Sequence, residues 1–429
     1  MDENIFPGHF CSIPWSSIEI NNLGYYRVCC ISNNIDTNNG IVKDSNGKPM
    51  HVLTHTVEDA LDSALHNSIR QSQLNNEKHK NCNTCWSKDR ALSKELQSSR
   101  RQWYLKALSP LLTEPVPQWK DVLQDTNIWK KPLISLDLKL GNLCNLTCAQ
   151  CDPINSSQWV EPYMEFTGNT GVNVGNLSRV EFTKKSNGRF VIDETNWHQD
   201  PRWHEQFKKI APGLRHIYIT GGEPMLVPFH NEMLEYLVET GLSNNIVMEY
   251  DTNLTAINPK IARQFGKFKE IQMRVSLDGM TDVYEYIRFP GDWKTVEKNI
   301  TENKHLILNL TACLMPYNAW QVPKYEEWAE SIGVKSAWRY IVVPKHLDLN
   351  MFPISMREDL IDLYSKHSSI PHIASASKHL LNNLHLPENP EAIKKFINWS
   401  NFLDRHRSKS WKELCPELAN HLKDYIKQH

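Results

Sequence analysis

Three cysteines stand close together where the chain leaves an apolar segment. Cys144, Cys148 and Cys151 form a C-x3-C-x2-C run directly after the strand-like residues 132–140. Thiolate sulfur favours zinc or iron–sulfur clusters, and three thiolates in one short loop can converge on a single centre. A structural zinc site normally closes with a fourth nearby ligand, but the next cysteine along the chain is Cys313. Three ligands and an open position therefore favour a [4Fe–4S] cluster with one free iron, and three unrelated thiols are the alternative.

A second group of cysteines lies near the start of the chain. Its members are Cys11, Cys29, Cys30, Cys82 and Cys85. The pattern of residues 11–20 predicts a strand, 21–24 a turn and 25–30 a returning strand, so Cys11 should lie near Cys29 or Cys30. A helical stretch at 57–75 precedes the last two cysteines, whose C-x2-C spacing is typical of a metal knuckle. These thiols predict a further metal centre, with zinc as the alternative because a hairpin plus a knuckle is also a zinc-ribbon arrangement.

Two further motifs follow the first cysteine run. Residues 217–224 read Ile-Tyr-Ile-Thr-Gly-Gly-Glu-Pro, and residues 275–279 read Val-Ser-Leu-Asp-Gly. With the cysteine run, and in this order, they resemble the cluster loop, the strand-then-GGEP element and the fourth-strand ending of the radical S-adenosylmethionine (SAM) enzymes. The resemblance implies that the three cysteines hold the cluster and that its free iron binds the amino and carboxylate groups of SAM. Reductive cleavage would then yield a 5′-deoxyadenosyl radical that abstracts hydrogen from a substrate.

The same resemblance implies a set of SAM-binding residues. They are Gly221, Gly222, Glu223, Pro224, Asn253, Ser276, Asp278 and Arg288. Two glycines let backbone groups approach a ligand closely. Asp278 could instead be a helix N-cap and Arg288 a solvated arginine on a helix face. Two positions depart from the family pattern, because Gln150 stands where an aromatic residue is frequent and Leu254 replaces the glycine of Thr-Asn-Gly, which predicts a different turn.

The N-terminal cysteines resemble a second known module. Cys11, the spacing Gly24-x4-Cys29 and the later C-x2-C are similar to the twitch domain, a shortened SPASM module, placed here before the barrel. The resemblance implies an auxiliary [4Fe–4S] cluster on Cys11, Cys29, Cys82 and Cys85, with Cys30 as the rival of Cys29. Four protein ligands would saturate this cluster, which favours electron transfer or a structural role.

Strands and helices alternate from residue 129 onward. Strands are predicted at 132–140, 214–220, 245–253, 271–278, 305–315 and 337–343, which indicates an α/β chain and a partial (β/α)6 TIM-like barrel. We expect a small α+β twitch domain at 1–130, the barrel at 131–345 and a helical extension at 346–429, with the Pro-rich residues 109–117 as a boundary. The insertion 154–213 is either a lid or a surface excursion.

Composition narrows the function further. Lys plus Arg number 48 and Asp plus Glu 49, so no net field indicates nucleic acid or an anionic membrane. No apolar run suits a membrane span or a secretory signal, and ten cysteines without a signal favour metal binding in the cytoplasm. A peptide or protein substrate is expected, with a small metabolite such as a sugar or nucleotide derivative as the alternative. An electron donor such as flavodoxin or ferredoxin is implied, and a non-catalytic zinc or Fe–S binding protein is the alternative of another class.

Overall fold

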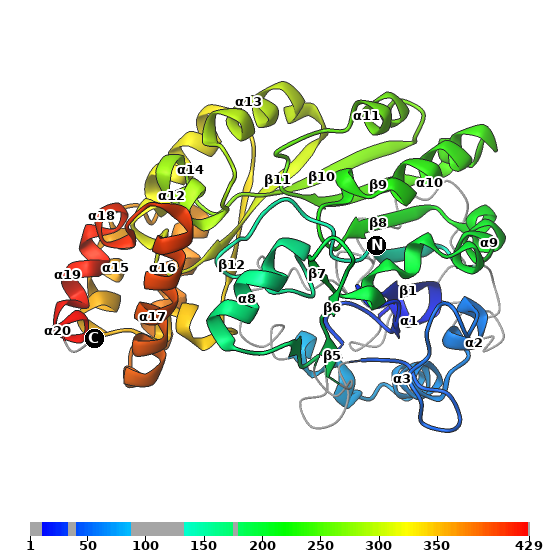
Figure 1. The fold of residues 1–429 in the computed structure, drawn as a ribbon, viewed down its shortest axis with the longest axis horizontal. Helices are drawn as coiled ribbons and strands as arrows, with labels where there is room; N and C mark the ends of the chain where they lie inside the picture. The colour runs from blue at the N-terminus through cyan, green and yellow to red at the C-terminus, as the bar shows by residue number, and fades with distance from the viewer. Residues whose placement is uncertain (1–10, 33–39, 87–132, 175–178, 428–429) are drawn as a thin grey trace. The chain divides into compact units, whose positions relative to one another are not determined.

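The computed structural model describes residues 11–32, 40–86, 133–174 and 179–427 (Figure 1). The chain divides into two compact units, each described by itself below. The first unit comprises Met1–Cys144, Pro153–Tyr250 and Asn258–Ile271. The second comprises Asn145–Asp152, Asp251–Ile257 and Gln272–His429. The Pro-rich boundary predicted at 109–117 lies outside the described residues.

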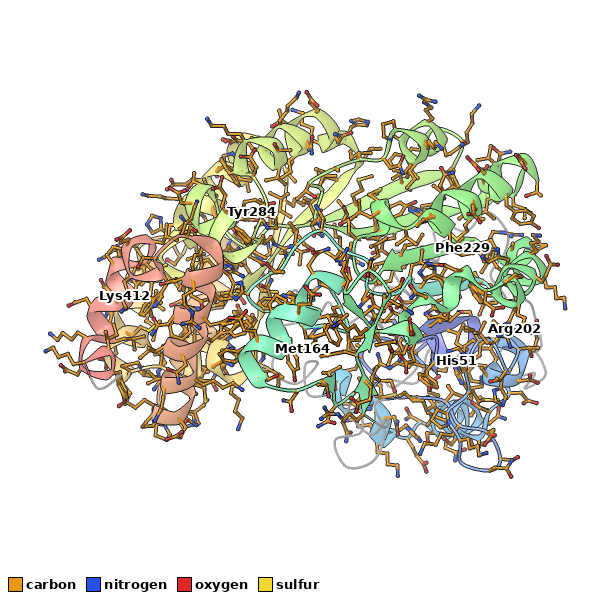
Figure 2. The ribbon with its side chains drawn as sticks, viewed as in Figure 1. His51, Met164, Arg202, Phe229, Tyr284 and Lys412 are labelled. Atoms are coloured by element: carbon orange, nitrogen blue, oxygen red, sulfur yellow. The ribbon has the colours of Figure 1, made fainter. Side chains whose placement is uncertain are left out.

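The first unit is built on a mostly parallel sheet. Its strands lie in the order β9 (Val247–Thr252, with its last two residues in the second unit), β8 (His216–Thr220), β3 (Ser135–Lys139), β1 (Ser17–Ile20) and β2 (Tyr26–Arg27). All neighbours are parallel except the β1–β2 hairpin. The connections carry α9 (Pro201–Ile210), α10 (Pro228–Glu239) and α11 (Pro259–Phe265). Phe229 of α10, labelled in Figure 2, stacks on His204 of α9 with ring centroids 4.5 Å apart, which joins two of these helices.

The N-terminal hairpin differs from its prediction in three ways. Its returning strand, predicted at 25–30, is only Tyr26–Arg27, so Cys29 and Cys30 lie beyond the strand. Residues Ile13–Ser16 form a helical turn, α1, because Pro14 fixes a helical φ near its start, and the strand begins only at Ser17. Strand β1 also pairs in parallel with β3, so the hairpin continues the sheet that carries the cysteine run. The predicted helix at 57–75 is two helices, α2 (Val57–Leu61) and α3 (Ala64–Leu74), since Ser63 caps the second.

A charged row crosses one face of this sheet. Strand register places Arg27, Glu19, Asp137, Tyr218 and Glu249 opposite one another on five successive strands. The opposite face carries apolar residues such as Ile18 and Leu136, as the period of two requires. Buried charges are costly unless paired, and Glu19 Oε1 accepts bonds from Arg27 and Lys139, each at 3.0 Å. Burial raises the pKa of Glu19, but the two cations outweigh it and lower this pKa overall.

The described residues of the insertion after the cysteine run form several helices and short strands. It contains α8 (Val160–Thr167), α9 and two short hairpins, β4–β5 (Gly171–Val172 with Val180–Glu181) and β6–β7 (Thr183–Lys184 with Phe190–Val191). Val160, Val180, Phe182 and Ile192 form a buried cluster with Leu23 of the N-terminal hairpin. The insertion is therefore a packed part of the first unit.

The second unit combines three parallel strands with a bundle of helices. Strand β10 (Glu270–Ser276, in this unit from Gln272) pairs with β11 (Ile307–Leu314), which pairs with β12 (Ser336–Tyr340). Their connections carry α12 (Thr281–Ile287), α13 (Trp293–Asn303) and α14 (Val322–Ser331). The tail follows as α15 (Ile354–Ser365), α16 (Pro371–Asn382), α17 (Pro390–Arg407), α18 (Trp411–Leu414), α19 (Pro416–His421) and α20 (Lys423–Ile426), gathered together in Figure 1.

These elements confirm the mixed α/β class. Six parallel strands, β3 and β8–β12, lie within a few residues of the predicted strands, and the tail is helical as expected. The open, partial-barrel shape and the division at residues 130 and 345 stay predictions. Within the described residues, no helix is both long enough and apolar enough to cross a membrane.

Candidate functional site

The first part of the cysteine loop is fastened by side chains of the first unit. Asn142 Nδ2 donates to the carbonyl of Pro153 at 2.8 Å, and Asn142 Oδ1 accepts from the Thr195 hydroxyl at 2.9 Å. Asn22, in the turn of the N-terminal hairpin, donates to the carbonyl of Gly141 at 2.8 Å. The backbone before Cys144 is therefore held from the insertion and from the hairpin, by residues that no motif singled out.

The GGEP element packs directly on this part of the loop. The amide of Gly222 donates to the Gly141 carbonyl at 3.1 Å, and the amide of Glu223 donates to the Leu143 carbonyl at 2.7 Å. A Cβ at Gly222 would lie 2.1 Å from Leu143 O, which is a steric overlap. The group that excludes a side chain at Gly222 is thus the backbone of the cysteine loop, whereas the sequence predicted that it would be a bound ligand.

Two buried residues hold the GGEP turn in shape. Glu223 is 2% exposed, and its Oε1 caps the turn by accepting from the Met225 amide at 3.1 Å. His230 of α10 lies 2.9 Å from the Pro224 carbonyl through Nδ1 and 3.0 Å from the Tyr250 hydroxyl through Nε2. Since a carbonyl can only accept, Nδ1 carries the proton and Nε2 accepts from Tyr250. Burial favours this neutral ring and lowers the pKa of His230 to about 4.

The remaining loop, with Cys148 and Cys151, belongs to the second unit. The amides of Thr147 and Ala149 donate to the carbonyls of Phe289 (2.7 Å) and Ile287 (2.8 Å), at the end of α12. Cys148 is buried and Cys151 half-buried. The loop backbone thus runs against the segment that carries Arg288.

Asn253 braces the same loop from the end of β9. Its Nδ2 donates to Asn145 Oδ1 at 3.0 Å, and Asn145 Nδ2 donates to the Thr255 hydroxyl at 2.9 Å. Leu254 nevertheless adopts a φ of 50°, the left-handed conformation that glycine takes most readily. Leu254 therefore adopts a backbone conformation that usually favours glycine, and the expectation of a different turn stays untested.

Asp278 and Arg288 form a buried ion pair beside Cys148. Arg288 Nη2 lies 2.7 Å from Asp278 Oδ2, and Arg288 Nη1 donates to Cys148 Sγ at 3.8 Å. Gln150 Nε2 also donates to Asp278 Oδ2, and the Cys313 amide donates to Oδ1, each at 2.5 Å. Burial opposes the charge on Arg288, but Asp278 and then Cys148 outweigh it and raise the pKa of the guanidinium. Asp278 is therefore not a helix N-cap, and Arg288 is not a solvated arginine on a helix face. Ser276, the last residue of β10, is half-buried.

The helical tail reaches the loop as well. Trp399 Nε1 of α17 donates to the Ala149 carbonyl at 3.1 Å. Arg407, the last residue of α17, donates to the carbonyls of Thr147 (2.6 Å) and Tyr286. Sequence reasoning missed both residues because the resemblance to the family ended before the tail, and no local pattern marks a contact about 250 residues away in the chain.

The N-terminal cysteines converge in the first unit. One apolar pocket is lined by all four predicted ligands, Cys11, Cys29, Cys82 and Cys85. Apolar neighbours such as Ile13, Val28 and Trp86 complete its lining. Cys30 is not among its lining residues. Burial, followed by the nearby Cys30, Cys11 and Cys82, raises the pKa of Cys29. The pocket brings these four thiols together, and the choice of Cys29 over Cys30 as a ligand stays a prediction.

Donor chemistry in both regions suits an iron–sulfur cluster. The four thiols of the apolar pocket are soft ligands, and Cys148 has a guanidinium beside its sulfur. Across the described part of the chain, no three His, Cys, Asp or Glu side chains already stand at the mutual distances of a metal site. The assignment of ligands therefore stays a prediction.

Comparisons with known proteins gave matches only among solved structures. No family model matches the chain. A search of curated proteins also found no significant match. Native anSMEcpe with bound AdoMet and Cp18Cys peptide is 15% identical, with a TM-score of 0.33 over 54% of this chain and 59% of that chain. SuiB from Streptococcus suis is 13% identical, with a TM-score of 0.35 over 70% of this chain and 61% of that chain.

A third match is TYW1 with a lysine-pyruvate adduct bound, 16% identical, with a TM-score of 0.28 over 56% of this chain and 72% of that chain. The chain thus covers less than two thirds of the first two structures. Similarity at this level carries no argument about the activity of this chain, which has to rest on its own residues.

Proposed function

We propose that this chain is a radical SAM enzyme. The observation that carries the proposal is the meeting of two distant motifs, because GGEP amides bond to the backbone of the cysteine loop at Gly141 and Leu143. A chance run of three thiols has no reason to be fastened by the element with which the family binds SAM.

The residues then divide into ligands and supports. Cys144, Cys148 and Cys151 would hold a [4Fe–4S] cluster, which when bound supplies the electron that cleaves SAM to a 5′-deoxyadenosyl radical. Gly221, Gly222, Glu223 and Pro224 form the turn assigned to the cofactor, and Ser276 stands at the end of β10 for its carboxylate or ribose. Asn253 holds the loop through Asn145.

We assign the N-terminal pocket to an auxiliary [4Fe–4S] cluster. Four thiols lining one apolar pocket support this assignment. Four protein ligands leave no open iron, so this centre would transfer electrons or stabilise the first unit. A zinc ion remains the alternative occupant, because four thiolates also satisfy zinc.

The proposed substrate is a peptide or protein, as the resemblance to twitch and SPASM modules implies. The proposed electron donor is a flavodoxin or ferredoxin. A small metabolite is the alternative substrate, and the described residues offer no acid or base that selects between the two.

Anaerobic reconstitution tests the central proposal. The reconstituted protein, given SAM and dithionite, should release 5′-deoxyadenosine, and the Cys148→Ala protein should release none. Mass spectrometry of the nucleoside products measures this. A folded, iron-loaded wild-type protein that leaves SAM intact would contradict the proposal and favour a binding protein.

A further inference from the structure

Arg288 lies between an anion and a thiol in the second unit. The residue is 7% exposed, with Nη2 on Asp278 at 2.7 Å and Nη1 directed at Cys148 Sγ at 3.8 Å. Its backbone amide donates to Tyr284 O at 2.8 Å, which fixes the end of α12; Tyr284 is labelled in Figure 2. The guanidinium therefore has little freedom to leave the sulfur.

Asp278 keeps that geometry because three donors hold its buried carboxylate. It is 0% exposed and accepts from Arg288, from Gln150 Nε2 and from the Cys313 amide. Three donors leave it poorly suited to bind a further ligand, so its role is to orient what surrounds it. One of these donors, Gln150, directly precedes Cys151 in the cysteine loop.

A buried cation beside a ligating sulfur has a known electrostatic effect. Hydrogen bonds to cluster sulfurs, together with local charge and burial, set the reduction potential. A donor stabilises the state with more negative charge on the sulfurs, which is the reduced cluster. A simple structural ion pair would have no need to direct its second nitrogen at Cys148.

We propose that Arg288 is a positioning residue that holds Cys148 Sγ and raises the reduction potential of the cluster, with Asp278 and Gln150 fixing its guanidinium. This rests on the proposed function for the cluster itself. It differs from the role expected for Arg288, since the guanidinium donates directly to the Cys148 sulfur while Asp278 fixes it in place, and it need not bind the carboxylate of SAM.

The test is a redox titration of the cluster in the absence of SAM. The variants are Arg288→Lys, which cannot reach both partners with one nitrogen, and Gln150→Met, which removes a donor from Asp278 while keeping side-chain length. The matched control is Arg357→Lys, since Arg357 is another buried arginine of this unit, bound only to the carbonyls of Asn383 and Leu386. The amplitude of the electron paramagnetic resonance signal of the reduced cluster gives the midpoint.

The expected result is a lower midpoint in Arg288→Lys, a smaller shift in the same direction in Gln150→Met, and none in Arg357→Lys. An unchanged midpoint in iron-loaded Arg288→Lys would overturn the inference. If Arg288→Lys takes up no iron, Gln150→Met decides in the same way. If SAM affinity falls tenfold in Arg288→Lys while the reduction midpoint measured without SAM is unchanged, Arg288 binds the SAM carboxylate instead.

The proposed function can fail separately. The titration needs only the cluster, and SAM cleavage is measured in the wild-type protein. A wild-type protein that binds a redox-active cluster but leaves SAM intact would contradict the enzyme and still allow the midpoint test. A protein that binds no iron at Cys144, Cys148 and Cys151 would end both.

Discussion

Gly222 shows how a single hydrogen atom can decide the packing of a loop. A methyl group there would lie 2.1 Å from Leu143 O and 2.5 Å from Leu143 C, both atoms of the backbone, so no side chain can turn away to make room. Moving the loop away to make room would break the hydrogen bonds that the amides of Gly222 and Glu223 donate to it. The glycine therefore governs the cysteine loop first and any bound SAM through it.

We predict that Gly222→Ala loses iron from the site of Cys144, Cys148 and Cys151 as well as SAM binding. The matched control is Gly266→Ala, because nothing lies within 4 Å of a Cβ there and its φ is not left-handed. Iron content after reconstitution and SAM binding by calorimetry measure the effect. Normal iron and SAM binding in Gly222→Ala would show that the loop and GGEP do not pack this way.

His230 makes the GGEP turn sensitive to acid. Its pKa is about 4 when folded, against about 6.5 when unfolded, so below pH 6.5 the unfolded chain takes up a proton that the folded chain refuses. Stability should therefore fall as pH drops from about 6.5 to about 4, by about 3 kcal/mol from this residue. Protonation of His230 Nε2 would also break the hydrogen bond from the Tyr250 hydroxyl, because Nε2 could no longer accept it.

The prediction compares the wild type with His230→Asn, which keeps a short donor for Pro224 but cannot titrate. At pH 7.5 the variant should be less stable, since Tyr250 loses its acceptor. At pH 5 the gap between the two proteins should narrow, because only the wild type is penalised for protonation at this position. Urea unfolding midpoints at both pH values measure the gap, and a constant gap would refute the assignment.

The sequence motifs identified the residues of the candidate site, but they did not identify the residues that hold these in place. Cysteine spacing, GGEP and the Ser-x-Asp-Gly ending selected residues such as Gly222, Asp278 and Arg288, because their chemistry depends on local spacing. Asn22 and Asn142 carry no such signal, since an asparagine bonded to a carbonyl 119 residues away looks like any turn residue. The partner of Arg288 was also missed, because an ion pair with Asp278 depends on the tertiary fold.

At the scale of elements, periodicity located the strands and failed at the hairpin. Buried parallel strands such as β8 and β10 are bounded by clear turn residues, so the predicted strands lie close to the observed ones. Alternation in residues 11–20 gave no sign that Pro14 begins a helical turn. It also could not show that β1 pairs with β3, because sequence pattern determines the strand but not its neighbour.

The tail is the element whose role was underestimated. Helix α17 buries Phe396, Phe402 and Leu403, and its Trp399 and Arg407 donate hydrogen bonds to the cysteine loop. It thereby serves as a support of the candidate site within the second unit. A functional role for this helix follows from those two contacts alone.

We predict that Trp399→Phe speeds the loss of iron from the cysteine loop. The variant keeps an aromatic ring but leaves the Ala149 carbonyl without its indole donor, at a cost of about 1 kcal/mol. Trp411→Phe is the matched control, because Trp411 is a buried tail tryptophan whose indole bonds to Asn401 and not to the loop. Iron release to a chelator should accelerate only in Trp399→Phe, and equal rates in the two variants would exclude a clamping role.

For the whole molecule, the two cysteine groups predict two separable metal centres. One group lines the apolar pocket of the first unit, and the other follows β3 into the loop. Reconstituted wild-type protein should hold about eight iron and eight sulfide, as two four-iron clusters require. Zinc with only about four irons would instead support a zinc site in the pocket.

Substitution of the pocket cysteines tests whether the two centres are independent. Cys82→Ala with Cys85→Ala should lower the iron to about four per chain and still allow some SAM cleavage, since the loop cysteines are untouched. Cys29→Ala should lose the auxiliary cluster and Cys30→Ala should keep it, because Cys29 is the one of this pair that lines the pocket. Iron content of the two single variants measures this directly. The opposite result would shift the ligand by one residue, and full iron in both variants would remove the auxiliary cluster from the first unit.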